Sequence, residues 1–163
     1  MPKKHVCIVM AISAMRQVAE EEGEGMVIPQ RFATFSRQVC AHDCGLVVNP
    51  ESLRRAVECG TLHGLSRAHE EVQFDIEKVT SVDWFSHPTL RHADVPESLE
   101  VVIVNGDPNP GRPDLPPYGA GEASLKPMFA AIANAIYDAT GVRVRRVPFR
   151  DARVLAALKA AGV

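Results

Sequence analysis

The feature that most constrains the fold is a run rich in proline and glycine, residues 105–117, which holds five prolines and two glycines. Proline lacks a backbone donor and glycine weakens both helices and strands, so no regular element fits there. Pro116 and Pro117 then lead into Gly119, Gly121 and Glu122. The sequence therefore predicts an ordered loop that ends in a carboxylate.

A helix is predicted directly after this carboxylate. Apolar residues recur on one face from Lys126 to Thr140, Pro127 suits the first helical position, and Gly141 is a typical stop. Glu122 could simply belong to a turn before a helix, whose first turn favours acids. Alternatively, the glycines let a bulky ligand approach the backbone, and a carboxylate in a poorly hydrated pocket acts as a general base. The local pattern leaves both interpretations open.

An earlier helix is predicted from the Asn49-Pro50 pair to about Glu71, because asparagine favours the N-cap and proline the next position. Its sequence includes Gly60 and Gly64, four residues apart on one face. Each glycine costs a helix roughly 1 kcal/mol relative to alanine. We therefore expect either another helix or a ligand to approach this face closely.

The other elements indicate an α+β fold with a mixed sheet packed against two or three helices. An apolar run near the N-terminus fits a strand or a buried helical turn equally well. The expected segments are a strand or turn at Val6–Ile12, hairpins at Met26–Ile28 with Ala33–Val39 and within Val72–Trp84, strands at Leu99–Val104 and Val142–Val147, and a helix from about Phe149 to Ala161.

Composition excludes several classes of protein. The length of 163 residues suits one domain, and a net charge of −2 offers no field for nucleic acid. No apolar run approaches the ~20 residues of a membrane span, so we expect a cytoplasmic protein. There is no hydrolase elbow, phosphate-binding loop or dinucleotide fingerprint.

Cysteines and histidines do not form a recognisable metal motif. Cys40 and Cys44 flank His42 with a C-x3-C spacing, but no second ligand pair follows, so buried thiols are favoured over zinc. Cys7 and Cys59 are interpreted in the same way, and the histidines are scattered. Free thiols favour a reducing compartment.

Three stretches, in this order, resemble one known family. They are Ala41-His-Asp-Cys-Gly-Leu-Val-Val-Asn-Pro50, Gly119-Ala-Gly-Glu122, and Ala130-Ala-Ile-Ala-Asn-Ala-Ile-Tyr-Asp-Ala-Thr-Gly-Val-Arg143. They are similar to the C-terminal part of the molybdopterin-binding large subunit of molybdenum hydroxylases, the xanthine dehydrogenase and aldehyde oxidase family. Within it, the branch of isoquinoline 1-oxidoreductase beta subunits looks most similar at Thr80–Trp84, Pro88–Arg91 and Val147–Phe149. Residues 39–163 would form part of the second molybdopterin-binding domain, while residues 1–38 match poorly.

The resemblance implies a hydroxylation whose oxygen comes from water. Glu122 occupies the position of the glutamate that takes the proton. Gly119, Ala120 and Gly121 would let the backbone approach the molybdopterin cofactor. The family's helix usually carries Gln-x-Glu-Gly where this chain has Ala56, Val57, Glu58 and Cys59, which makes Ala56 and Glu58 the expected cofactor-facing positions.

The family's subunits are several times longer than this chain, so we expect activity only together with a complementary molybdopterin-binding chain and an iron-sulfur subunit. The substrate would be a small N-heteroaromatic compound or aldehyde. The alternative is a non-catalytic remnant or assembly module of such a domain without cofactor.

Overall fold

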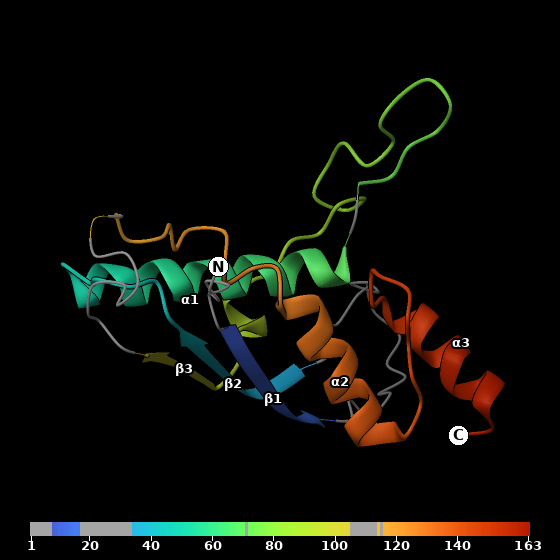
Figure 1. Ribbon diagram of the computed structural model, residues 1–163. Coiled ribbons are helices and arrows are strands. Elements are labelled where there is room, and N and C mark those ends of the chain that lie inside the picture. The colour runs from blue at the N-terminus through green and yellow to red at the C-terminus, as the bar shows by residue number, and fades with distance from the viewer. Residues whose placement is uncertain (1–7, 17–33, 71, 105–113, 115) are drawn as a thin grey trace.

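The computed structural model describes residues 8–16, 34–70, 72–104, 114 and 116–163. The described residues form three strands, three α-helices and one short 3-10 helix (Figure 1). They are β1 Ile8–Arg16, β2 Thr34–His42, α1 Pro50–His69, η1 His92–Asp94, β3 Ser98–Ile103, α2 Met128–Thr140 and α3 Asp151–Ala161.

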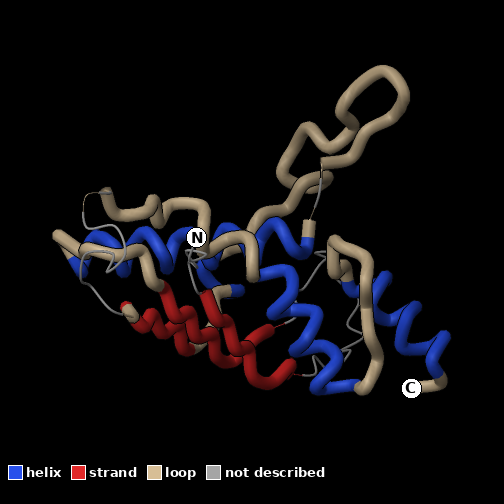
Figure 2. The backbone as a smooth tube through the Cα atoms, in the orientation of Figure 1, coloured by secondary structure: helices blue, strands red, loops and turns tan. Residues whose placement is uncertain are grey.

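The described strands form a mixed sheet in the order β1-β2-β3. β1 runs antiparallel to β2, with Ile8 opposite His42, and β3 runs parallel to β2, with Ser98 opposite Arg37. The parallel pair is connected through α1, which lies along the sheet, while α2 runs beside β1 and α3 lies beyond α2 (Figures 1 and 2). The predicted α+β fold, a mixed sheet packed against helices, is confirmed.

The core has two parts. The larger cluster lies among the C-terminal half of α1, α2 and the segment through α3, and its buried members are Leu65, Ala68, Met128, Ile132, Ala135, Ile136, Val144, Phe149 and Val154. The smaller cluster joins β2, α1 and β3 through Cys40, Val57 and Val101. α1 therefore contributes to both clusters and connects the sheet to the helices. None of the described helices is long and apolar enough to cross a membrane.

Local signals set the helix ends. The Asn49 side chain accepts a hydrogen bond from the backbone N–H of Ser52 at 3.0 Å, which confirms the predicted start of α1. Gly141 closes α2 in the left-handed conformation at φ 72°, as expected for a glycine stop. α2 begins at Met128, two residues later than predicted, because Pro127 is the N-cap and residues 121–127 form consecutive turns.

One predicted strand is wrong, and one predicted hairpin is present only as a single antiparallel bridge. Val142–Val147 pairs with no strand in the described part of the chain; Val144 is buried in the helical core, and the Arg143 guanidinium stacks on the Tyr137 ring at 3.9 Å. Within Val72–Trp84 the only pairing is an isolated bridge between Phe74 and Val79. Alternation of apolar and polar residues indicates extended backbone in both places, but a strand also needs the edge of another strand with which to pair.

At the N-terminal end, β1 shows that the strand interpretation of Val6–Ile12 is right for its described residues. β2 contains most of the predicted Ala33–Val39 strand, and its antiparallel partner is β1. Met26–Ile28 and Cys7 lie outside the described residues. Cys40 and Cys44 are buried as expected, whereas Cys59 is exposed because it lies on the solvent-facing side of α1.

Candidate active site

The predicted site loop rests on the two glycines of α1. A Cβ added at Gly60 would overlap the Ser124 Oγ and would lie 3.1 Å from the Gly121 carbonyl oxygen. One added at Gly64 would lie 2.9 Å from both the Leu125 carbonyl oxygen and the Met128 Cβ. The glycines are therefore needed for close packing of the segment that leads into α2. Of the two predicted reasons for the glycine pair, packing is the one that applies.

The same loop is tied to the end of β2. The Tyr118 backbone N–H donates to the Cys44 carbonyl oxygen at 2.9 Å. Cys44 is followed by Gly45, which turns the chain at φ 79° and donates its N–H to the Asp43 Oδ1 at 3.1 Å. The structure thus brings together the His-Asp-Cys-Gly turn, the Gly-Ala-Gly-Glu loop and the glycine face of α1.

Glu122 is exposed at the end of this loop, and its carbonyl oxygen accepts a hydrogen bond from the Leu125 N–H at 3.2 Å. Gly119 and Gly121 are exposed as well, and a Cβ added at either would meet nothing within 4 Å. Ala120 is partly buried. The described residues therefore present the carboxylate and the open backbone on a surface, and the poorly hydrated pocket expected around Glu122 is not formed by them.

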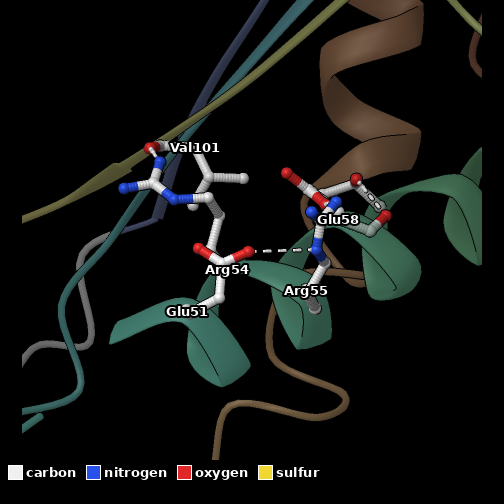
Figure 3. Close-up of polar contacts among 6 residues, drawn as sticks. Glu51, Arg54, Arg55, Glu58 and Val101 are labelled. Carbon is white, nitrogen blue, oxygen red and sulfur yellow. Dashed lines mark hydrogen bonds and ion pairs between the residues drawn. The ribbon is translucent and has the colours of Figure 1, made fainter. Parts of the chain in front are cut away.

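The two predicted positions on α1 have different surroundings. Ala56 is partly buried and lies one turn before Gly60, on the same helix face. The Glu58 carboxylate accepts a hydrogen bond from the Arg55 Nη1 at 3.2 Å (Figure 3), and a residue two positions from Gly60 points to another face. The structure therefore brings Ala56, but not Glu58, onto the face that carries the loop.

Arg54 also contributes to the geometry of α1. Its Nη1 donates to the Val101 carbonyl oxygen at 2.6 Å, which ties the first turns of the helix to β3 (Figure 3). A hydrogen bond from a charged donor contributes about 1.5–3 kcal/mol. The helix that supports the loop is thus fixed to the sheet at one end and to the helical core at the other.

Sequence reasoning missed Ser124, whose side chain packs directly on α1. Its hydroxyl is buried against Gly60 and has no hydrogen-bond partner among the described residues. The sequence feature that could have indicated this contact is a small residue just before the predicted second helix, together with the glycine face predicted for the first helix. This signal is too weak to assign a contact.

Buried polar groups also line the inner face of β2. Gln38 and His42 are almost fully buried, and within the described part of the chain their side chains have no hydrogen-bond partner. Burial lowers the pKa of His42, although the nearby Asp43 carboxylate acts in the opposite direction. Burial raises the pKa of the Cys40 thiol to about 11, which disfavours the thiolate that a metal would need. The described residues contain no group of three or more side chains suited to a metal ion.

The fold and the loop together define a segment of a larger oxidoreductase subunit. The structure of aldehyde oxidoreductase from Desulfovibrio gigas superposes with a TM-score of 0.62 and 30% identity, over 77% of this chain and 14% of that chain.

Sequence comparison gives the same result. One of the nicotinate dehydrogenase subunits of Pseudomonas putida is 38% identical over 128 residues, which cover 78% of this chain and 10% of the relative. The aldehyde oxidoreductase molybdenum-binding subunit PaoC of Escherichia coli is 35% identical over 113 residues, covering 68% of this chain and 15% of the relative. No protein-family model matches the chain.

The chain is therefore homologous to a portion of the large subunits of molybdenum hydroxylases. It spans only about a tenth to a sixth of the length of the curated relatives it matches. The matches extend over nicotinate, aldehyde and isoquinoline enzymes, so they do not single out the isoquinoline branch.

Proposed function

We propose that this chain is the part of a molybdenum-dependent hydroxylase that supplies the general base, Glu122, for oxidation of an N-heteroaromatic or aldehyde substrate with water as the oxygen source. The substrate classes come from the names of the relatives, which include a nicotinate dehydrogenase and aldehyde oxidoreductases. The observation that carries the proposal is that the loop before Glu122 packs against Gly60 of α1 and leaves the backbone of Gly119 and Gly121 open.

The loop fits a bulky cofactor that approaches from outside the chain. Because Gly119 and Gly121 have open space where a side chain would be, their backbone can meet a molybdopterin directly. Ala120 lies between them, and Ala56 offers a small side chain one turn before Gly60 on α1. Glu58 would reach the cofactor only by releasing Arg55. These residues would form one wall of the site.

When bound, the molybdenum cofactor would supply the centre that activates the oxygen derived from water and accepts two electrons from the substrate. Glu122 would accept the proton from that oxygen at its carboxylate. Its place within the turns that lead into α2 positions the carboxylate next to the backbone of Gly121, one of the residues expected to face the cofactor.

Completion of the site would require a complementary molybdopterin-binding chain or segment that covers the loop and excludes water. Exclusion of water strengthens the electrostatic interactions of a carboxylate and makes it a better proton acceptor. An iron-sulfur subunit would carry the electrons away. The second candidate, an assembly module without cofactor, is supported by the exposure of Glu122 within the described chain.

The test is the cofactor content of the protein purified, with its associated chains, from its native host. The proposal predicts molybdenum and pterin in stoichiometric amounts, measured by elemental analysis and by fluorescence of the oxidised pterin. A complex that contains neither would reject the catalytic proposal and favour the assembly module.

A further inference from the structure

The most exposed apolar surface of the described chain lies on an arm, residues 72–87, that follows α1. Figures 1 and 2 show it projecting beyond the C-terminal end of α1, away from the sheet. Trp84 is 78% exposed and Phe85 is 91% exposed. Other exposed apolar residues of the arm are Phe74, Ile76, Val79 and Val82. Exposed large apolar side chains concentrated on one short segment typically mark a surface for another macromolecule.

The arm is ordered by its own hydrogen bonds. The Thr80 N–H donates to the Gln73 carbonyl oxygen at 2.9 Å, and the Asp75 N–H donates to the Lys78 carbonyl oxygen at 3.0 Å. In the second turn, the Asp83 Oδ1 accepts from the N–H groups of the residues two and three positions later, at 3.0 and 2.8 Å. These bonds lower the pKa of Asp83. The backbone that carries the apolar side chains is therefore ordered before any partner arrives, which reduces the entropy cost of binding.

The base of the arm is attached to the body of the protein. Just after the arm, the Leu90 N–H donates to the Ser66 hydroxyl of α1 at 3.2 Å, and within the arm the Gln73 N–H donates to the buried Ser81 hydroxyl at 2.8 Å. Close in sequence to this base, Glu70 forms an ion pair with Arg150 at 2.8 Å. The arm is thus fixed at its root and exposed at its end, the arrangement expected of a docking element.

The relatives indicate what covers the arm. Because this chain matches only 10% to 17% of their length, the corresponding segment in those proteins is part of a much larger subunit. We propose that the arm docks onto the rest of a molybdopterin-binding large subunit. This inference rests on the proposed function and specifies its partner.

The charged side chains of the arm indicate which charges the partner surface would carry. Asp75, Glu77 and Asp83 outnumber the single lysine of the arm, Lys78, so the partner would offer an apolar groove with basic side chains at its rim. A second copy of this chain fits less well, because two arms placed together would bring like charges into contact.

The test is co-purification of the tagged chain from its native host, with the retained polypeptides identified by mass spectrometry. The wild-type chain is expected to retain a molybdopterin-binding polypeptide, and Trp84→Ser with Phe85→Ser to retain at least tenfold less. Ile76→Ser, at a fully exposed position on the same arm, should also weaken retention. Val163→Ser, at an exposed apolar residue of the C-terminus, is the matched control and should leave it unchanged. Circular dichroism verifies that each variant is folded.

Three results would overturn the inference: retention unaffected by both arm variants, no molybdopterin-binding polypeptide with the wild-type chain, or a homodimer that the arm variants convert to a monomer. Molybdenum content of the same preparations tests the proposed function separately. A metal-free complex that depends on Trp84 keeps the docking role and rejects catalysis. A molybdenum-loaded complex whose retention does not depend on the arm residues would reject the docking role and keep the catalytic proposal.

Discussion

Among single residues, His42 is the side chain whose protonation the fold most clearly opposes. It is fully buried on the inner face of β2, and neither ring nitrogen has a hydrogen-bond partner among the described residues. Burial outweighs the Asp43 carboxylate and lowers the pKa of His42 below its ordinary value of 6.5. His69 is also buried, and its pKa is lowered for the same reason. The folded chain therefore disfavours the protonated form of both rings.

This arrangement predicts that the free energy of unfolding falls as the pH is lowered below about 6.5. In that range the unfolded chain binds protons at His42 and His69 that the folded chain does not, so acid favours unfolding. Urea titrations at pH 7.5 and pH 5.5 would measure the difference. His42→Leu should reduce it, because one of the two groups is gone. If wild type and variant lost the same stability on acidification, His42 would not be held neutral by burial.

Among the helices and loops, the contact between α1 and the segment before α2 determines where Glu122 lies. Gly64→Ala would place a Cβ 2.9 Å from a backbone oxygen and from the Met128 Cβ. Overpacking of this kind costs about 1–3 kcal/mol, more than the roughly 1 kcal/mol that alanine adds to a helix. We expect net destabilisation, measured by chemical denaturation.

Two further variants act as controls. Gly60→Ala should also destabilise, and Ser124→Ala should partly rescue it, since the atom that the new Cβ would overlap, the Ser124 Oγ, is then removed. Gly119→Ala should change stability by less than about 0.5 kcal/mol, because nothing lies within 4 Å of its Cβ position. Wild-type stability in Gly64→Ala would show that the helix and the loop are not closely packed at this point.

Elements whose signals are local can be predicted from the sequence. Asn49 and Pro50 determine the start of α1, and Gly141 determines the end of α2, because capping depends on adjacent residues. The strand predicted at Val142–Val147 is wrong, and the hairpin predicted within Val72–Trp84 is reduced to one bridge, because strand pairing depends on a neighbouring edge. For the site, the sequence identifies the loop and the glycine pair. It cannot predict the Ser124 contact or the exposure of Glu122, which depend on tertiary packing.

For the molecule as a whole, the described chain supplies one side of a larger arrangement. The loop with Glu122 is held from beneath by α1 and β2 but is not covered by the described residues, and the arm presents exposed apolar side chains. This chain matches only a small part of each relative, so the relatives contain further polypeptide. Such polypeptide would supply the cover for the Glu122 loop and the partner surface for the arm. We therefore expect the chain to function within an assembly.

The most direct test of the general-base assignment is the turnover of the assembled, molybdenum-loaded enzyme with Glu122→Gln, compared with Asp138→Asn on the exposed face of α2. If Glu122 is the general base, kcat should fall by about 10²–10⁴-fold while KM changes little, since the amide keeps the shape but accepts no proton. Asp138→Asn, which removes a negative charge elsewhere, should retain wild-type kcat. A wild-type kcat in Glu122→Gln would contradict the assignment of Glu122 as the base.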